Sequence, residues 1–552
     1  MSYVHANTFI KCYKPPPSDR YKERKETRDM HQDNESNSGS NPGPGSNYLI
    51  VRPHRGGYKD LFQYGVRGDE TSKNKFLERP DDHSDRTTSV INVQADDRRW
   101  VIVVSILVRK IIGLLRTPME YTGLVVDFVL NLLSANGGLL GLVLGLIKAK
   151  VVIPERGSVD FVSTIGQLDG RIDLYKGWSF VEQLVCMEDS VSSGSSKRVG
   201  IEPGSRGLVD LCVMASKLAY ENAKVVENVV SLHWKMNLVE FLDCWNDYQK
   251  QMSTQVFILT DKEKDADLIL ISFRGTEPFD ADDWGTDFDY SWYEIPNVGK
   301  LHMGFIEAMG LGTRDYTPTF DYHLVELNSS EKENSQKNLP EMVERSAYYA
   351  VRETLKRLLA EHANAKFVVT GHSLGGALAI LFPTLLVLKE ETEMMKRLLG
   401  VYTFGQPRIG NREIGSFMKA KLNHPVDRYF RVVYCNDLVP RLPYDDTTFL
   451  YKHFGVCLYY DSFYNETRAE DEPDPNPYGM RYAVLAHVNA VWELVRGLMM
   501  GFIYGTGYKE GWFRILFRLI GLMIPGLSDH CPTDYVNSVR LGPDYDLQMS
   551  PL

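Results

Sequence analysis

Residues 367–380, which read FVVTGHSLGGALAI, decide the fold of this chain. An apolar, β-branched run leads into a G-x-S-x-G pattern, and a run rich in alanine and leucine follows it. A strand that turns sharply into a helix at such a pattern holds its serine on a strained corner, with the hydroxyl above the strand ends. Gly371 and Gly375 flank this corner, where a Cβ atom would collide with the neighbouring strand or helix. We therefore predict a nucleophile elbow with Ser373 as the nucleophile.

Strand and helix patterns alternate around this elbow. Further strand patterns lie at residues 256–260, 268–273, 400–404 and 429–434, and helical patterns lie at 341–361 and 375–389. A short polar turn between the first two strands predicts that they form a hairpin. Strand–helix alternation in the rest builds a largely parallel sheet with helices on both faces. We expect an α/β domain that spans residues 154–552.

The composition excludes several classes of protein. The chain has 552 residues, 43% of them hydrophobic and 24% charged, so most of it can bury a core. A net charge of -10 at pH 7 offers no general attraction to nucleic acid. The seven cysteines are scattered and lack C-x-x-C spacing, which argues against a disulfide framework and a zinc site. The first residues lack the apolar core of a signal peptide, so we expect a cytosol-facing location.

Residues 1–97 are polar, and we expect them to be largely disordered. Within them, residues 15–47 are rich in Pro, Ser, Asn, Gly, Lys and Glu, a composition that buries too little apolar surface to fold. Tyr48 to Val51 is a short strand-like run.

Residues 98–153 differ in kind, because they contain two apolar runs, Trp100–Leu115 and Thr122–Ile147. The second run is long enough to span a bilayer, and basic residues flank the pair at both outer ends. We predict a lipid-associating segment, and the alternative is a pair of buried helices packed on the α/β domain. A later hydrophobic stretch, residues 491–527, suits either a core helix pair or a helix at an interface.

Polar residues inside this segment argue against a simple span. Asp127, Asn131 and Asn136 would be costly in hydrocarbon. Pro118 is expected to break the helix between the two runs. With both basic flanks on the cytosolic side, a re-entrant hairpin or a pair of interfacial helices follows.

A serine hydroxyl becomes a nucleophile only with a histidine base and a buried carboxylate that orients it. In folds with this elbow, the acid and then the base follow the serine along the chain, on loops after later strands. Asp437 meets this requirement, because it lies in a loop directly after the strand pattern at 429–434. His453, His487 and His530 all follow it, so spacing alone does not choose the base. The loop setting of His530, after a proline and a glycine, favours it.

Further motifs accompany the elbow: Phe273-Arg274-Gly275-Thr276, His302-Met303-Gly304-Phe305, Asn436-Asp437-Leu438-Val439-Pro440, Asp529-His530 with Tyr535, and the acidic run at 282–287. Together they resemble the class three lipases, and within that family the plant oil-body triacylglycerol lipases. The resemblance begins near residue 154 and implies the α/β-hydrolase fold. It also places the base at His530 and assigns the oxyanion hole to the backbone N–H groups of Thr276 and Leu374. Two such donors are what a tetrahedral intermediate requires.

One stretch departs from the family pattern. Fungal members carry a short amphipathic lid after the oxyanion strand, whereas this chain has an acidic, aromatic-rich stretch from Asp280 to Tyr293. What covers the site is therefore open. The clustered aspartates could be interpreted as a metal site, but we expect a solvated face, and acyl transfer by a triad needs no metal or other cofactor.

The resemblance implies a triacylglycerol lipase, with di- and monoacylglycerol as further substrates. Residues 98–153 occupy the place of the droplet-targeting region in the oil-body family, which implies a location on lipid droplets or the endoplasmic reticulum membrane. Two alternatives stay open. A phospholipase A or galactolipase would carry the same elbow, since the elbow recognises the ester and not the headgroup. A non-catalytic lipase-like signalling module would not need the complete triad.

Overall fold

The computed structural model describes residues 47–80, 99–175, 203–324, 346–423, 426–443, 450–473 and 480–542. The chain divides into two units, Met1–Gly45 and Ser46–Leu552, and all described residues belong to the second. The tail expected at residues 15–47 therefore lies outside the described residues, apart from Asn47.

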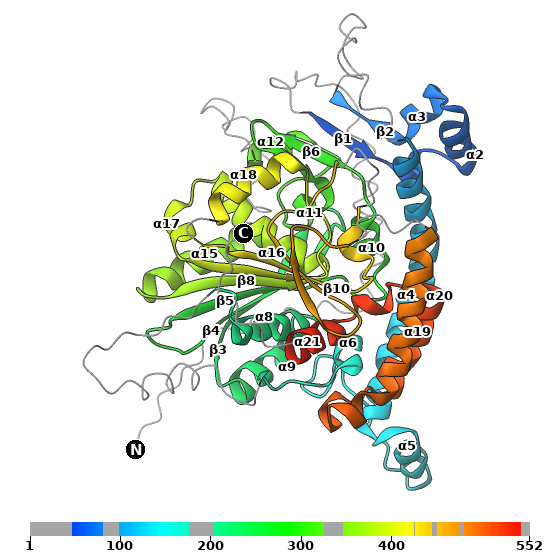
Figure 1. Cartoon of the computed structure of the whole chain (residues 1–552), viewed down its shortest axis with the longest axis vertical. Coiled ribbons are helices and arrows are strands. Elements are labelled where there is room, and N and C mark those ends of the chain that lie inside the picture. The colour runs from blue at the N-terminus through cyan, green and yellow to red at the C-terminus, as the bar shows by residue number, and fades with distance from the viewer. Residues whose placement is uncertain are drawn as a thin grey trace, which may run out of the picture. The chain divides into compact units, whose positions relative to one another are not determined.

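An eight-stranded sheet of order β12-β11-β10-β9-β8-β5-β4-β3 forms the centre of the second unit (Figure 1). The strands are β3 (Asn237–Asn246), β4 (Gln251–Thr260), β5 (Leu268–Phe273), β8 (Lys366–His372), β9 (Leu398–Phe404), β10 (Tyr429–Tyr434), β11 (Val456–Tyr460) and β12 (Glu466–Ala469). Pairs from β5 through β11 are parallel, and the outer pairs are antiparallel. This mostly parallel sheet confirms the predicted fold class, and β4 and β5 form the expected hairpin.

Helices cover both faces of this sheet (Figure 1). One core contains side chains of α15 (Ala347–Glu361), α16 (Leu374–Leu388) and α18 (Arg412–Leu422). The opposite core contains side chains of α8 (Arg206–Leu218), α9 (Ala223–Asn228) and α21 (Pro532–Leu541). Phe367 and Val369 of β8 point into the first core and Val368 into the second, as the alternation of a strand requires. Because both faces are buried, a site must form from the loops at the strand ends.

A single long helix, α4 (Arg99–Ala135), runs through Pro118, so the break expected there is wrong. Proline has no N–H to donate to the carbonyl four residues before it. Pro118 lies on the exposed side of the helix, so that carbonyl is not left unpaired in a core. The chain bends instead by 75° before α5 (Gly138–Ile147), at the glycine pair Gly137 and Gly138, both of which have positive φ. In the described part of the chain no single helix is long and apolar enough to cross a membrane, whereas α4 and α5 together reach that length and composition.

Residues 47–80 fold, which differs from the disorder expected for residues 1–97. They form β1 (Tyr48–Val51), α2 (Tyr58–Phe62), α3 (Glu70–Phe76) and β2 (Leu77–Glu78). β1 joins β2, β6 (Trp292–Ile295) and β7 (Gly299–His302) in a second, four-stranded sheet of order β2-β1-β6-β7. The few apolar side chains of residues 47–80 pack against the first turns of α4 and form one small core. The segment is polar on average, yet its few apolar side chains are enough once α4 supplies the other half of the core.

Candidate active site

Ser373 lies on a strained corner between β8 and α16. Its backbone has φ 58° and ψ -133°, a conformation that few residues other than glycine adopt. A Cβ atom on Gly371 would lie 2.2 Å from the backbone of Gly375, and one on Gly375 would lie 2.3 Å from the carbonyl oxygen of Phe273. The glycines are therefore required by the close approach of β5, β8 and α16. Ser373 itself is 1% exposed.

The predicted acid and base meet Ser373 across large sequence separations. Asp437 lies in the turn after β10, and His530 lies in the short helical turn Ser528–His530 before α21. The Nε2 atom of His530 is 2.8 Å from Ser373 Oγ, and its Nδ1 atom is 2.8 Å from Asp437 Oδ2. Because a carboxylate only accepts, Nδ1 carries the proton and Nε2 is free to accept one from the serine.

The two alternative histidines lie elsewhere. His453 is buried, and its Nε2 atom is 2.7 Å from the carbonyl oxygen of Pro440. His487 is exposed on a helix, and its Nδ1 atom is 2.7 Å from the carbonyl oxygen of Ala483. Neither forms a hydrogen bond with Ser373 or Asp437 among the described contacts.

Asp437 is fully buried and held by further donors. The Tyr535 hydroxyl donates to Oδ2 at 2.5 Å, and the backbone N–H of Val439 donates to Oδ1 at 2.9 Å. Burial, and then the charge of Asp437, raises the pKa of the Tyr535 hydroxyl well above its usual value, so it stays a donor. These contacts fix the orientation of the carboxylate toward His530.

The two predicted oxyanion donors flank the elbow. Leu374 is the first residue of α16, and N–H groups in a first helical turn lack an acceptor within the helix. Thr276 follows Gly275, whose Cβ would lie only 2.3 Å from the carbonyl oxygen of His372. The loop after β5 therefore lies directly against the elbow. The Thr276 hydroxyl donates to Asp287 Oδ2 at 3.3 Å.

The sequence did not predict that a second histidine, His372, holds the backbone of His530. The Nε2 atom of His372 donates to the carbonyl oxygen of His530 at 2.9 Å, and Nδ1 accepts from the Tyr220 hydroxyl at 2.8 Å. Burial, followed by the nearby His530, holds the pKa of His372 well below its usual value, so it is neutral. His372 thus anchors the backbone of the catalytic loop. Its position within the G-x-S-x-G motif was the only sequence signal.

A short helix, α10 (Ala281–Asp287), lies beside the triad. The indole of Trp284 lies edge-on to the His530 ring, with 6.4 Å between the ring centroids. α10 also packs on α4, where Arg116 forms an ion pair with Asp282 at 2.5 Å. α10 therefore contacts both the ring of His530 and α4.

The solvated acidic face expected in this stretch is wrong, since Asp283, Asp287 and Asp289 are buried. Asp289 forms ion pairs of 2.7 Å with both Arg109 and Arg314. Within the described part of the chain Asp287 has no cationic partner at bonding distance, and burial raises its pKa to about 7, although His530 opposes the shift. The alternation of aspartate with small and aromatic residues concealed this burial in the sequence.

Among the residues that the structure describes, one group of buried side chains has the spacing of metal ligands: Cys435, Glu493 and Asp529. Burial, and then Glu493, raises the pKa of Asp529 well above its usual value, which favours its protonated form. The backbone N–H of Asn436 donates to its Oδ2 at 3.0 Å. A cation would have to displace the protons that burial favours on Asp529 and on the Cys435 thiol, and we assign no metal here.

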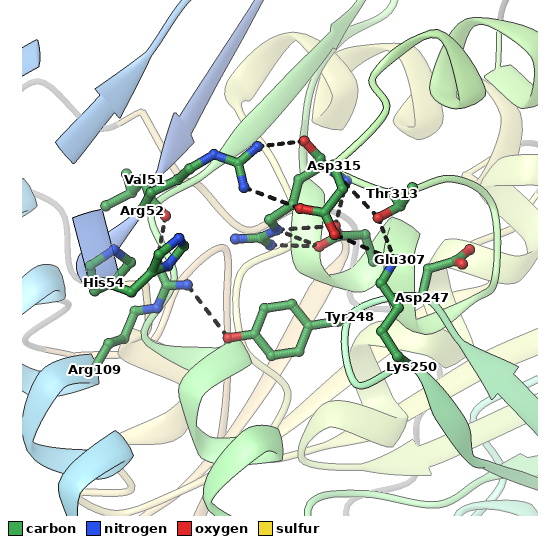
Figure 2. A pocket seen from close by; sticks show the side chains of 12 residues that line it. Val51, Arg52, His54, Arg109, Asp247, Tyr248, Lys250, Glu307, Thr313 and Asp315 are labelled. Atoms are coloured by element: carbon green, nitrogen blue, oxygen red, sulfur yellow. Dashed lines mark hydrogen bonds and ion pairs between the residues drawn. The ribbon is translucent and has the colours of Figure 1, made fainter. Parts of the chain in front are cut away.

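A charged cavity of about 210 Å³ lies apart from the triad, between β1, α4 and the turn after β3 (Figure 2). Arg52 forms an ion pair with Asp315 at 3.2 Å, and Arg109 donates to the Val51 carbonyl oxygen at 3.1 Å. Arg314 pairs with Glu307 on the opposite wall. The arginines that line the cavity bind carboxylates and carbonyl groups of the protein itself. These contacts join β1 to α4 and to the α/β unit.

Comparison with known proteins identifies the family. The model of the class 3 lipases matches residues 270–447. Triacylglycerol lipase OBL1 of Arabidopsis thaliana is 80% identical, over 95% of this chain and 100% of the relative. The chain belongs to the OBL1 group of class 3 lipases. This finding confirms the resemblance inferred from the motifs.

Two further OBL1 lipases and one solved structure match this chain at lower identity. The OBL1 lipases of Nicotiana tabacum and Ricinus communis are 52% and 45% identical, over 92% and 90% of this chain and 98% and 95% of the relatives. The crystal structure of a lipase from Rhizopus microsporus var. chinensis is 21% identical, with a TM-score of 0.31, and the match covers 49% of this chain and 78% of that chain.

Proposed function

We propose that this chain hydrolyses triacylglycerol at the surface of lipid droplets and releases fatty acids. The observation that carries the proposal is the hydrogen-bonded chain from Asp437 through His530 to Ser373, with 2.8 Å at each step. Its 80% identity to a triacylglycerol lipase supports the choice of substrate.

In this mechanism Ser373 Oγ attacks the acyl carbon while His530 Nε2 takes its proton. The backbone N–H groups of Thr276 and Leu374 hold the oxyanion of the tetrahedral intermediate. His530 then returns the proton to the departing glycerol oxygen, which leaves an acyl-enzyme. Water attacks this ester with the same histidine as base, and the fatty acid leaves. Asp437 keeps the proton on Nδ1 throughout and stabilises the imidazolium.

We further propose that different segments of the chain carry out catalysis and lipid binding. Residues 154–552 carry the chemistry and residues 98–153 contact the lipid, while residues 1–97 form a polar N-terminal region whose residues 47–80 are folded. Two polar groups of the 98–153 segment turn toward the α/β unit: Asp127 accepts from Thr164 at 2.5 Å, and Asn131 donates to the Val162 carbonyl at 2.8 Å. Asn136 donates to the Val152 carbonyl at 2.8 Å, within the segment itself.

Each of the three polar residues that argued against hydrocarbon contact thus has a hydrogen-bond partner within the protein. Leu114 of α4 and Leu140 and Ile147 of α5 are exposed on the outside. Large apolar side chains gathered on one exposed face are unusual for a surface in water and fit a lipid monolayer. The expected location is the oil body, with the triad on the cytosolic side and the endoplasmic reticulum membrane as a second site.

The test compares purified full-length chain on emulsions of triacylglycerol, diacylglycerol and phospholipid, with Ser373→Ala as the control. We expect the highest rate on triacylglycerol and a loss of at least about 10⁴-fold in the variant. A preference for phospholipid would favour a phospholipase A instead. Absence of hydrolysis, together with no labelling of Ser373 by a fluorophosphonate probe, would favour the non-catalytic module.

The lipid segment is tested in the full chain, because α4 packs on α10 and its truncation would expose that contact. Leu140→Glu with Ile147→Glu places two charges on the exposed face of α5. We expect reduced recovery with floated droplets, measured by quantitative immunoblotting. Unchanged flotation would contradict the role proposed for residues 98–153.

A further inference from the structure

Two C-terminal helices have their charged side chains inside and their apolar side chains outside. They are α19 (Met480–Ile503) and α20 (Trp512–Met523), which pack against each other. On α19 the exposed large apolar side chains are Val484, Leu485, Val488, Val491, Trp492, Val495, Leu498, Met499, Phe502 and Ile503. On α20 they are Trp512, Leu516, Leu519, Ile520 and Met523. Phe502 is 92% exposed and Met523 82%.

The exposed residues of α19 recur at intervals of three and four, so they form one stripe along the helix. Of the side chains that the structure describes on α19 and α20, the charged ones are Glu493, Arg496, Arg514 and Arg518, and all four are buried. His487 is the one ionisable side chain among these that is exposed. A surface helix in water has the opposite arrangement.

The buried charges hold this helix pair in place. Arg518 donates to Asp534 at 2.9 Å and to Glu510 at 2.5 Å, and Arg496 is 3.5 Å from Asp534. Arg514 also pairs with Asp534. Burial alone would raise the pKa of Asp534, but Arg518 and Arg514 hold it below its usual value. Burying such a cluster carries a large desolvation penalty, which is poorly explained if the outer face meets only water.

The same helices contact both catalytic loops. Arg514 donates to the carbonyl oxygen of Ser528 at 3.2 Å, two residues before His530. The Tyr482 hydroxyl donates to the carbonyl oxygen of Asn436 at 2.9 Å, next to Asp437. The apolar stripe is therefore fixed to the loops that carry the base and the acid.

We propose that the exposed face of α19 and α20 is a second lipid-docking surface, which seats the catalytic unit on the acylglycerol phase. The inference rests on the proposed function, because it takes its occupant from that function. Protein interfaces bring about one hydrogen bond per 100–200 Å², and this face offers almost no polar group for one. A hydrocarbon surface requires none.

The position of the face fits the same occupant. α6 (Thr164–Leu168) contacts both α4 and α20, and Figure 1 shows α4, α19 and α20 along the same side of the sheet. The exposed apolar side chains of α4 and of the helix pair can thus meet one lipid surface together. Residues 98–153 would attach the chain, and α19 and α20 would set the orientation of the triad relative to the oil.

The experiment introduces charge into the face of the full-length chain. The double variant Leu498→Glu with Met523→Glu is compared with Leu232→Glu, since Leu232 is 70% exposed and Leu498 59%, and Leu232 lies outside both helices. Leu498→Met keeps the face apolar. The readout is the rate on a triolein emulsion divided by the rate on dispersed p-nitrophenyl butyrate, with binding to triolein droplets coated by phosphatidylcholine measured in parallel.

We expect this ratio and droplet binding to fall by about tenfold or more in the double variant, and to stay within about twofold of wild type in Leu232→Glu and Leu498→Met. An unchanged ratio in the double variant overturns the inference. So does a wild-type dimer that becomes monomeric in the variant with droplet binding intact, since the face would then bind a second copy. If wild type hydrolyses neither ester, the proposed function fails instead. Equal losses on both substrates would show a folding defect and contradict a docking role.

Discussion

A single methyl group added at Gly405 tests the triad geometry most sharply. Gly405 follows β9 and has a φ of +60°. A Cβ atom there would lie 2.9 Å from Asp437 Oδ2, from His530 Cε1 and from the Tyr535 hydroxyl. Favourable carbon contacts begin near 3.5 Å, so Gly405→Ala must displace these groups by about 0.5 Å or more. A misplacement of about 1 Å can reduce a rate by about 10²-fold.

We therefore expect kcat on dispersed p-nitrophenyl butyrate to fall by about 10-fold to 100-fold in Gly405→Ala. The left-handed backbone adds about 1–2 kcal/mol of strain in any such variant. Gly157→Ala isolates that strain, because Gly157 has a φ of +72° and nothing within 4 Å of its Cβ position. Urea unfolding measures stability for both variants. If Gly405→Ala loses stability as Gly157→Ala does but retains the wild-type kcat, the close packing of the triad is refuted.

Three further predictions concern groups around the triad. His530→Ala should lose at least about 10⁴-fold in kcat, whereas His453→Ala should lose stability and retain most of its activity; the reverse pattern in ester assays would refute the assignment of the base. Tyr535→Phe removes a donor to Asp437 worth about 1.5–3 kcal/mol, so kcat should fall by about 10-fold to 150-fold with KM unchanged, and a kcat equal to wild type would contradict this role. Because burial raises the pKa of Asp287 from 3.8 to about 7, the folded chain keeps a proton that the unfolded chain releases, and stability falls as pH rises between these values. Asp287→Asn should flatten this dependence in unfolding measured from pH 5 to pH 8, and an unaltered slope would argue against the raised pKa.

The elbow could be predicted because its physical demands are local. A strand, a serine between glycines and a helix lie within residues 367–380, and each glycine marks a backbone contact. Asp437 was also predictable, since a loop directly after a strand places a side chain at the sheet edge. The base was not fixed by spacing, and its choice needed the family motif. The contact between Tyr220 and His372 joins residues 152 apart, and no sequence pattern announces it.

The helices that face outward show where periodicity stops being informative. In residues 480–523 the sequence presents an apolar stripe and a charged stripe, and this pattern is the same whether the apolar side faces a core or a lipid. The two orientations differ in where the charged side chains find ion-pair partners. Asp534 lies on α21 and receives three arginines from α19 and α20, so the charged stripe must turn inward. The orientation is therefore decided by a carboxylate outside both helices, and the outward apolar face follows from where that carboxylate is buried.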